Sequence, residues 1–343
     1  MKKIKIVSIT LVLLFTIILL IKDDVVWKHD ESEGWTVGLV KVNKGDNEFD
    51  IFTKIENGDI LKIDKSDVKI EDSVVFLADP FLFKHNDSMF LFVETQIKGR
   101  GAIITTFYID HSGKPQFLGT ALREPFHLSY PQIIKFGKDV FMIPESQAGD
   151  SSFVYECVSM PLVWRRVGNV SPGRIKDPTI WKKTDTSGYL YFGQRGKLYK
   201  SDLLFVGGRF KIGEKVYVKT GTAMRPGGRL LKKDSITWLP LQDNTRGYGT
   251  SLMVYPLMDN GQINREIEPK MVLTTSKVHP EFSHGMHHYC LDTLSKDEFL
   301  VAVDGNNKVS NAFKMNVFVK YNYLNFWDFV FGDSREPWYP FNE

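Results

Sequence analysis

Short apolar runs separated by polar turns follow one another along almost the whole chain. The clearest pair is residues 78–83 and 89–94, joined by the polar segment 85–88. Runs this short, bounded by turn residues, are typical of β-strands, and helical periodicity is nearly absent. Two antiparallel strands joined by such a turn form a hairpin whose open ends lie side by side. We therefore predict an all-β chain, with Asp79 and Glu94 close together at the open end of this hairpin.

The same hairpin recurs four more times along the sequence. Each unit opens with a marker residue, and four of the five markers are followed directly by proline, at positions 80, 131, 178 and 226. The markers are Asp79, Tyr130, Asp177, Arg225 and His287, spaced by 51, 47, 48 and 62 residues. A polar residue closes each hairpin 15 to 18 positions after its marker: Glu94, Glu145, Gln194, Asp243 and Asp304. A period of this length indicates a repeat architecture.

The repeat has the size of a propeller blade. Further strand-like runs between the hairpins, such as 102–109 and 153–157, give four short strands in roughly 50 residues. A solenoid is the alternative, but it would not place matched polar residues at both ends of each hairpin. We therefore predict a five-bladed β-propeller over residues 35–331, followed by a tail at 332–343. The strand at 35–40 is expected to pair with the last blade and close the ring.

The first 24 residues have a different pattern. Lys2, Lys3 and Lys5 precede an uncharged run of sixteen residues, 6–21. This is the pattern of a signal sequence or a membrane helix. The run is shorter than the about 20 residues of a spanning helix, so a cleaved signal is the alternative. No alanine stands before Ala78 to form a cleavage site. We predict a signal anchor (a single transmembrane helix) at 1–24 and a linker at 25–34. The lysines place the propeller on the extracytoplasmic side.

Charge, cysteine content and missing motifs exclude several classes of function. The chain of 343 residues has 44 basic and 41 acidic residues, a net charge of +3, and no long basic run. We therefore expect no nucleic-acid partner. Cys157 and Cys290 fall in units that are not neighbours, so we expect two unpaired thiols. The glycine-rich nucleotide loops and the Gly-x-Ser-x-Gly motif are absent, so no cofactor is expected.

The hairpin ends of all five units should meet at one mouth of the central channel, because the innermost strands of a propeller surround that channel. The mouth would combine six carboxylates with an arginine and a histidine, and convergent polar groups of this kind indicate a binding site. Carboxylates and guanidinium groups hydrogen-bond sugar hydroxyls well. Tyr130, Trp181 and Trp238 could offer flat faces to sugar rings. The expected partner is a glycan or a glycolipid headgroup.

Two functions remain open for this mouth. Glycoside hydrolysis needs two carboxyl groups, about 5–5.5 Å apart for retention or about 6.5–9.5 Å for inversion. In this enzyme interpretation Asp79 is the base, Glu145 is the acid, and Asp177 tunes and orients the pair. In the binding interpretation the mouth holds a sugar without turnover. The substrate-binding candidates are Glu94, Tyr130, Arg225, Asp243, His287 and Asp304.

A structural interpretation competes with both functions. Asp-Pro at the start of a strand often serves as a turn or bulge device. Asp243 and Asp304 are expected to pair with Arg225 or Arg229. His284, His287 and His288 raise the question of a metal, but neighbouring strand residues face opposite sides, and residues four apart are roughly 13 Å apart. We therefore predict no metal site, and expect one histidine to line the channel.

Several segments together resemble a known family. They are residues 78–81, 127–131, 142–146, 177–179, 241–243, 287–289 and 303–305. Over nearly all of residues 35–320 the chain resembles the N-terminal propeller of plant glucosamine inositolphosphorylceramide transferases, which is also found in bacterial proteins. The glycosyltransferase fold of the plant proteins is a separate C-terminal domain, for which this chain has no room. The resemblance therefore implies no transferase activity, and a separate glycosyltransferase as a partner.

A more distant resemblance is to the five-bladed glycoside hydrolases of the arabinanase and fructosidase group. Those enzymes use an acid in the first blade, an aspartate of the Asp-Pro kind in the third and a glutamate in the fourth. Asp79 and Asp177 match the first two. The fourth blade carries Arg225 and Asp243 at the corresponding places. The resemblance therefore implies a hydrolase-like mouth in which Glu145, from the second blade, would have to act as the acid.

Overall fold

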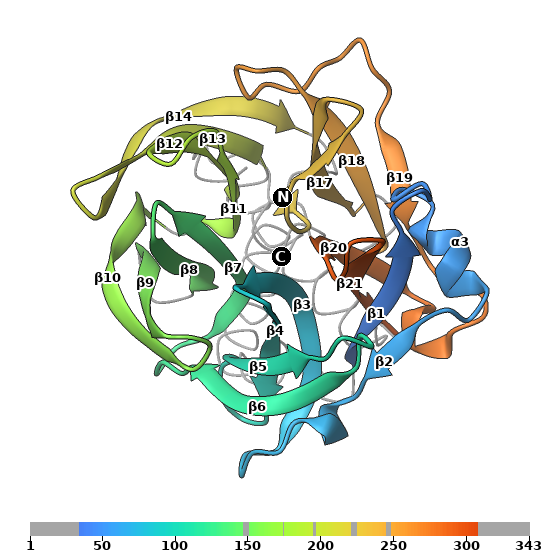
Figure 1. The fold of residues 1–343 in the computed structure, drawn as a ribbon. Coiled ribbons are helices and arrows are strands. Elements are labelled where there is room, and N and C mark those ends of the chain that lie inside the picture. The colour runs from blue at the N-terminus through green and yellow to red at the C-terminus, as the bar shows by residue number, and fades with distance from the viewer. Residues whose placement is uncertain are drawn as a thin grey trace, which may run out of the picture. The chain divides into compact units, whose positions relative to one another are not determined.

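Five antiparallel sheets surround a common centre (Figure 1). The computed structural model describes residues 34–146, 151–173, 175–194, 197–220, 225–244 and 248–307. Each sheet contains four or five strands and is one blade of a β-propeller. The prediction of an all-β, five-bladed propeller is confirmed.

The blades follow the chain in order, with the innermost strand first in blades 1 to 4. Blade 1 contains β3 (Val74–His85), β4 (Ser88–Ile97), β5 (Ile103–Ile109) and β6 (Pro115–Leu122). Blade 2 contains β7 (Leu128–Phe136), β8 (Asp139–Ser146), β9 (Ser151–Ser159) and β10 (Val163–Pro172). Blade 3 contains β11 (Lys176–Lys182), β12 (Ser187–Gln194), β13 (Lys197–Val206) and β14 (Arg209–Thr220). Blade 4 contains β15 (Arg225–Pro226), β16 (Leu231–Lys233), β17 (Ile236–Asp243), β18 (Ser251–Leu257) and β19 (Lys270–Leu273).

The fifth blade joins both ends of the propeller sequence. It contains β20 (Gly285–Thr293), β21 (Glu298–Asn306), β1 (Trp35–Asn43) and β2 (Leu61–Ile63). β1 pairs with β21 along its whole length, from Trp35 opposite Asn306 to Asn43 opposite Glu298. The predicted closure of the ring by the first strand is therefore confirmed.

The hydrophobic core of the described residues is divided among the contacts between blades. Each of five clusters lies where two neighbouring blades meet. Between blades 2 and 3, for example, Phe141 and Ile143 pack with Ile180 and Leu190. Because the apolar side chains fill these interfaces, the inner ends of the strands are left for polar residues.

The described part of the chain contains little helix. The short helix α3 (Ile51–Glu56) packs Ile51 and Ile55 into the cluster between blades 4 and 5, and two turns of 3₁₀-helix lie at Lys65–Asp67 and Pro280–Phe282. None of these helices has the length and apolar character needed to cross a membrane. The predicted anchor at 1–24 and tail at 332–343 lie outside the described residues.

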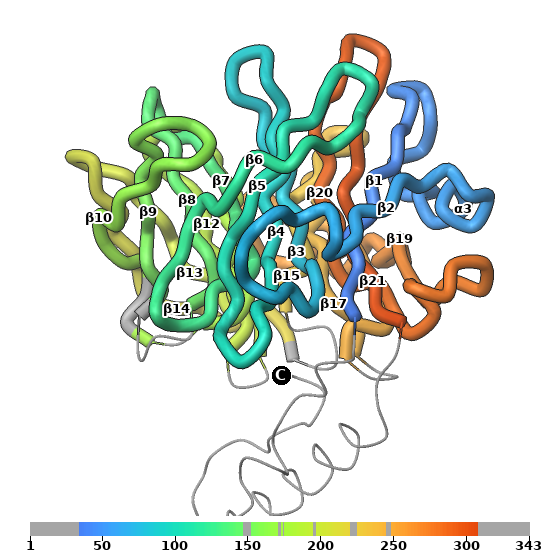
Figure 2. Tube along the Cα trace, turned by 90° about the horizontal axis from the view of Figure 1, so that it is seen from below, coloured from blue at the N-terminus to red at the C-terminus, as the bar shows by residue number. Residues whose placement is uncertain are grey.

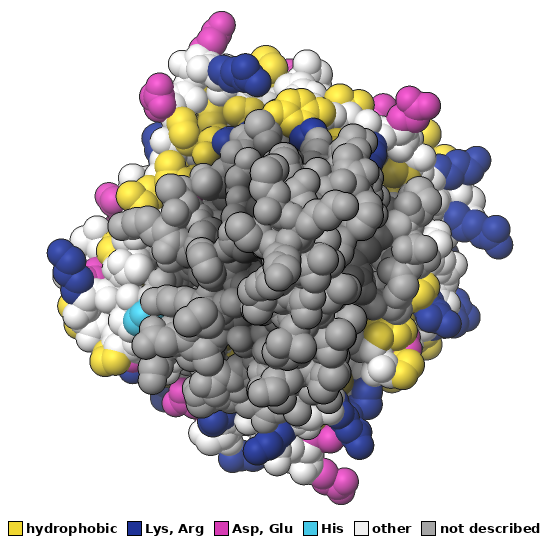
Figure 3. All heavy atoms as spheres, turned by 180° about the vertical axis from the view of Figure 1, so that it is seen from behind, with side chains coloured by type: hydrophobic (Ala, Val, Ile, Leu, Met, Phe, Trp, Pro, Cys, Tyr) yellow, Lys and Arg dark blue, Asp and Glu magenta, His cyan; other side chains and the backbone are white. Residues whose placement is uncertain are grey.

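The two faces of the ring differ in the connections that they carry. Figure 2 shows that the β3–β4 turn and the β20–β21 turn lie at the same face. The marker residues lie away from these turns, toward the open ends of the inner hairpins. Seen from behind, acidic and basic side chains both occur around the outer edge, with hydrophobic side chains between them (Figure 3). The two cysteines are unpaired, as predicted; Cys290 is buried and Cys157 is partly exposed.

Candidate functional site

Four of the five markers stand at breaks in the pairing of the inner hairpins. His287 lies at the shift between Gly285 and His288, and the other three share a further feature. The register shifts between Ala78 and Phe81 in blade 1, and equivalent shifts occur at Ser129/Gln132 and Lys176/Thr179. At these bulges Asp79, Tyr130 and Asp177 have φ angles of 49°, 50° and 48°. Few non-glycine residues adopt positive φ, and a bulge redirects the residue that it contains. In blades 1 to 3 the marker-proline signature therefore coincides with a bulge that turns the marker N–H away from its own hairpin, whereas Arg225 and Pro226 pair in regular register with Gln242 and Leu241.

The N–H group of each bulged marker is bound by a carboxylate from the preceding blade. The Asp79 N–H donates to Asp304 Oδ2 at 2.8 Å, and the Tyr130 N–H donates to Asp79 Oδ2 at 3.1 Å. The Asp177 N–H donates to Glu145 Oε2 at 3.0 Å. A buried N–H without an acceptor is costly, so these bonds stabilise the fold. Asp304, Asp79 and Glu145 therefore each have a structural task that joins neighbouring blades.

Arg225 connects the acids of blades 2 and 3. Its guanidinium group donates twice to Asp177, with Nε 2.6 Å from Oδ2 and Nη2 3.0 Å from Oδ1. Gln242 Nε2 also donates to Asp177 Oδ2, at 2.9 Å. Arg225 Nη2 also lies 3.6 Å from Glu145 Oε2, while Lys176 Nζ lies 3.1 Å from Glu145 Oε1. Bidentate ion pairs between an arginine and a carboxylate are strong and have a fixed geometry.

These surroundings shift the pKa values of Glu145 and Asp177 in opposite directions. Burial alone would raise the pKa of Glu145, but Lys176 and Arg225 hold that pKa below its usual value. Burial, opposed by Arg225 and assisted by Glu145, raises the pKa of Asp177 to about 7. Glu145 is therefore ionised at neutral pH, and an ionised carboxylate has no proton to donate.

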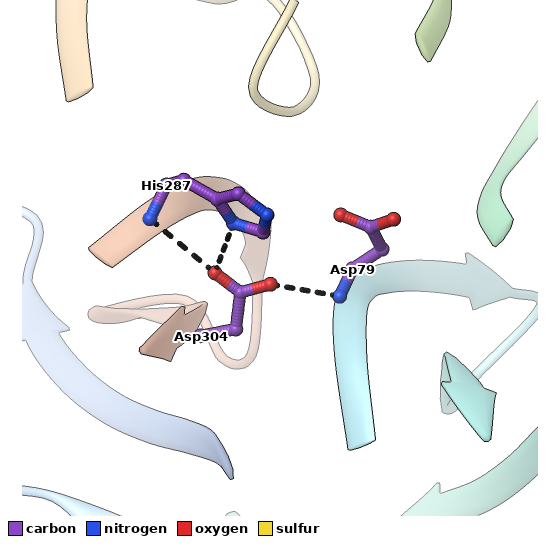
Figure 4. A group of neighbouring side chains, drawn as sticks. All are labelled: Asp79, His287 and Asp304. Atoms are coloured by element: carbon purple, nitrogen blue, oxygen red, sulfur yellow. Dashed lines mark hydrogen bonds and ion pairs between the residues drawn. The ribbon is translucent and has the colours of Figure 1, made fainter. Parts of the chain in front are cut away.

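A second cluster consists of Asp304, His287 and Asp79 (Figure 4). His287 Nδ1 is 2.7 Å from Asp304 Oδ1, and another side of the imidazole points toward the Asp79 carboxylate. Burial would lower the pKa of His287, but Asp304, Asp79 and Asp177 raise it. Burial would raise the pKa of Asp79, but the close approach of His288, whose Nδ1 lies 3.5 Å from Asp79 Oδ1, and the nearby His287 and Arg225 lower it to about 2.

The three residues of this second cluster also have the composition of a metal site. One ligand atom from each of Asp79, His287 and Asp304 lies within 4.8 Å of the others. However, both Asp304 oxygens already accept hydrogen bonds, one from His287 and one from the Asp79 N–H. His287 Nδ1 must carry a proton to donate to Asp304, so this nitrogen is not a metal ligand. Hydrogen bonds therefore account for the arrangement of the cluster.

Aromatic faces lie beside the charged groups. The Trp35 ring stacks on His287, with centroids 4.0 Å apart and an interplanar angle of 22°. Tyr248 meets both rings edge-on and lies beneath the Arg225 guanidinium, 5.4 Å from ring centroid to cation. Gly249 has φ +66°, and a side chain there would place Cβ 2.6 Å from the Trp35 ring. Glycine at 249 therefore makes room for Trp35.

Glu94 is an acid of the site whose surroundings favour the protonated form. It stands opposite Ala78 in the inner hairpin, next to the bulge at Asp79. Burial raises its pKa well above the usual value, and the charge of Asp79, a hydrogen bond shared with Asp79, and the charges of Glu145 and Asp304 raise it further. These surroundings favour the protonated form of Glu94 and the ionised form of Asp79 beside it.

Comparison with known proteins assigns a family to this architecture. The family model of the N-terminal domain of glucosamine inositolphosphorylceramide transferase 1 matches residues 29–306. The chain belongs to this family. The Arabidopsis thaliana protein of that name is 27% identical over 325 residues, which cover 86% of this chain and 42% of the relative. The protein of that name from Oryza sativa subsp. indica is 37% identical over 91 residues, 26% of this chain and 12% of the relative. The chain thus spans less than half the length of these curated relatives.

Solved structures of family-43 glycoside hydrolases share the fold. A thermostable member has a TM-score of 0.50 and 12% identity, with 69% of this chain and 91% of that chain covered. A β-xylosidase has a TM-score of 0.51 and 11% identity, with coverage of 68% and 92%. An enzyme of Xanthomonas citri, solved with xylotriose, has a TM-score of 0.51 and 9% identity, with coverage of 69% and 88%. At these identities the likeness extends to the fold alone.

Most residues that the sequence singled out fall in two neighbouring clusters in this member of the transferase N-terminal family, and Tyr248 contacts both through Arg225 and His287. The two clusters contain Asp79, Glu94, Glu145, Asp177, Arg225, His287 and Asp304. The expected pairing of Asp304 with an arginine is not what the structure shows, because Asp304 binds His287 instead. Arg225 binds Asp177 and Arg229 binds Asp292.

Two predicted site residues have other surroundings. Tyr130 is fully buried; its hydroxyl accepts a hydrogen bond from the Gly228 N–H at 2.6 Å and lies 2.6 Å from Thr179 Oγ1. This position fixes the contact among blades 2, 3 and 4 and leaves no face for a ligand. Asp243 ends β17, where its carbonyl oxygen accepts a hydrogen bond from the Thr250 hydroxyl.

Sequence reasoning missed four residues that shape the site: Trp35, His127, Lys176 and Tyr248. Two of them carried a usable signal. Lys176 directly precedes a marker, and Trp35 begins the strand that closes the ring. Tyr248 lies between strands, where no periodic pattern reveals its direction.

Proposed function

We propose that the central ring of charged and aromatic side chains binds a glycan, or the sugar headgroup of a glycolipid. The ionised Asp79 and the guanidinium of Arg225 suit the hydroxyl groups of a sugar. Trp35 and Tyr248 add aromatic rings beside these charged groups, stacked on His287 and beneath Arg225 respectively. The curated relatives are named for glucosamine and inositolphosphorylceramide, and the shared fold occurs in enzymes named for carbohydrates.

One observation favours binding over hydrolysis. Glu145, the acid of the hydrolase interpretation, accepts the Asp177 N–H and faces both Lys176 and Arg225. A general acid must hold a proton until the transition state, whereas these partners favour the ionised form. Glu145 therefore acts as a structural anion between blades.

A glycoside hydrolase remains the second candidate because of Asp79 and Glu94. Their pKa values are moved apart, that of Asp79 to about 2 and that of Glu94 upward, which is how environments separate a base from an acid. However, Glu94 stands opposite Ala78, directly beside Asp79 in the same hairpin, whereas the two carboxyl groups of a glycoside hydrolase flank the scissile bond. Hydrolysis would require the pair to separate around the substrate.

The proposal extends to the place of action. The Lys2, Lys3, Lys5 segment and the uncharged run 6–21 support a single membrane anchor with an extracytoplasmic propeller. In this arrangement the ring would present a surface glycan or glycolipid to a separate glycosyltransferase, which would supply the chemistry. Protease protection of the propeller in sealed membrane vesicles tests the orientation.

Glycan-array binding by the purified full-length chain tests the main proposal. We expect a restricted set of glycans to bind, and Asp79→Asn and Arg225→Met to weaken that binding. Glu214 lies exposed on β14, so Glu214→Gln is the matched control and should leave binding unchanged. Absence of binding to every glycan would overturn the proposal. Product analysis on the glycans that bind distinguishes hydrolysis, which Asp79→Asn should abolish.

A further inference from the structure

Glu94 differs from the two acids at equivalent places in other blades. Glu145 and Asp304 each end a closing strand and bind the N–H of the next marker. The next marker after Glu94 is Tyr130, but the Tyr130 N–H donates to Asp79 instead. Asp79 thus takes over the structural task of the first blade. Glu94, unlike Glu145 and Asp304, therefore accepts no hydrogen bond from the N–H of the next marker.

His127 determines which oxygen of Glu94 carries the proton. The Ala102 N–H donates to His127 Nδ1 at 3.1 Å, so Nδ1 is an acceptor and the ring proton is on Nε2. His127 Nε2 lies 3.4 Å from Glu94 Oε1. Gly101 packs tightly against this histidine, because a Cβ at 101 would lie 2.7 Å from His127 Cα. Oε1 therefore faces a donor, and the proton of Glu94 belongs on Oε2, on the Asp79 side.

The surroundings of Glu94 favour its neutral form. The titratable groups that face it are Asp79 on β3, His127 before β7, Glu145 on β8 and Asp304 on β21, with Tyr248 nearby. Three of these groups are carboxylates, and the side chain is only 8% exposed. Like charges and burial both oppose ionisation. The result is a carboxylic acid beside the ionised Asp79.

We propose that Glu94 is the hydrogen-bond donor of the ring and that, together with Asp79, it selects an uncharged sugar hydroxyl. A bound hydroxyl takes the place of the direct contact between the two side chains: it donates to the Asp79 carboxylate and accepts from the Glu94 acid at the same time. A phosphate or carboxylate group offers only acceptors and meets the negative charge of Asp79. An ammonium group offers only donors and cannot accept from Glu94. This inference rests on the proposed function and names the ligand group that this part of the ring takes.

Calorimetric titration of the full-length chain with an array-positive glycan, over a range of pH, tests the inference. Wild-type affinity should fall as pH rises through the pKa of Glu94, since the ionised form has no proton to donate. Glu94→Gln keeps an N–H donor and does not titrate, so it should retain binding without the alkaline fall. Glu94→Ala removes the donor and should weaken binding roughly 10- to 100-fold. A deoxy analogue lacking the selected hydroxyl should bind equally to wild type and Glu94→Ala.

His287 also titrates near this site, so the comparison between wild type and Glu94→Gln is decisive. The inference is overturned if Glu94→Ala binds as wild type does, or if Glu94→Gln keeps the same alkaline fall. Glu214→Gln should follow the wild-type profile.

If no glycan binds, the proposed function fails, and infrared spectroscopy still tests Glu94. The C=O band of protonated carboxylic acids should be present in wild type and weaker in Glu94→Gln, because any contribution of Asp177 is common to both proteins. Its absence from wild type at neutral pH would overturn the inference as well.

Discussion

The carboxylate of Asp304 accepts a hydrogen bond from the backbone N–H of Asp79 at 2.8 Å, across 225 positions of sequence. Its other oxygen binds His287 Nδ1 at 2.7 Å. One side chain of the last inner hairpin therefore holds both the bulge of the first blade and an imidazole of the candidate site. The ring is closed twice, by strand pairing between β1 and β21 and by this bond near the centre.

Removal of the Asp304 carboxylate should destabilise the propeller strongly. Asp304→Ala leaves the Asp79 N–H and His287 without their acceptor inside the protein, which should cost about 3–5 kcal/mol of unfolding free energy. Asp304→Asn keeps one acceptor oxygen and should cost less. Urea unfolding followed by tryptophan fluorescence measures both. Asp297→Asn, at an exposed turn, is the control, and a loss no larger than that of the control would contradict the assignment.

Loss of Arg225 should be partly compensated by loss of its acid partner. Arg225→Met leaves Asp177 and Glu145 buried with less positive charge, which should cost about 3–5 kcal/mol. Arg225→Lys keeps the charge but loses the bidentate hydrogen bonding to Asp177, so we expect a smaller loss of unfolding free energy than for Arg225→Met. In a double-mutant cycle with Asp177→Asn the two losses should couple by about 1–3 kcal/mol. Simple additivity would show that the pair contributes no interaction energy.

Tyr130→Phe should affect stability and leave glycan binding unchanged. The variant removes the hydroxyl that accepts the Gly228 N–H and contacts Thr179, so a loss of about 1–3 kcal/mol is expected. Tyr217→Phe, at an exposed tyrosine of β14, is the matched control. Thermal unfolding and glycan titration on the same samples separate the two effects. Weaker glycan binding at unchanged stability would contradict this role and show that Tyr130 takes part in ligand binding.

Asp79 should contribute to stability in a defined acidic range. Its pKa is about 2 in the folded protein against an ordinary value of 3.8, so the ionised form is favoured by folding. This contribution is fully present above about pH 4 and disappears as pH falls toward 2. The unfolding free energy of wild type minus that of Asp79→Asn should therefore shrink by about 2 kcal/mol over this interval. A difference that stays constant down to pH 2 would contradict the lowered pKa.

The arrangement of blades could be predicted because each inner hairpin carries its own local signature. Marker, proline, polar turn and closing residue recur in register, and strand pairing within a hairpin depends on residues close in sequence. The fourth blade departs from this rule. The expected opening strand at 224–230 is split into β15 (Arg225–Pro226) and β16 (Leu231–Lys233). Between them a Cβ at Gly228 would lie 1.9 Å from the Tyr289 carbonyl oxygen. The sequence shows the glycine but not the neighbouring blade that requires it.

The members of the site could be predicted better than their tasks. Open hairpin ends place acids near the centre, and this follows from topology alone. Whether an acid is ionised depends on groups from other blades, as Lys176 and Arg225 show for Glu145. Tyr130 has a φ of 50°, close to those of Asp79 and Asp177. Its hydroxyl nevertheless reaches Gly228 and Thr179 in other blades, and its own hairpin does not reveal these contacts. Trp35 and Tyr248 come from outside the repeated hairpins.

The pairing of β1 with β21 has a consequence for folding during synthesis of the chain. Trp35 leaves the ribosome early, but its partner Asn306 follows 271 residues later (306 − 35). At about 5–20 residues per second, synthesis of that interval takes roughly 15 to 50 s. Throughout this time the first strand has no partner on its β21 side, and unpaired strand edges invite aggregation. Newly made chains should therefore depend on chaperones until translation has passed residue 306.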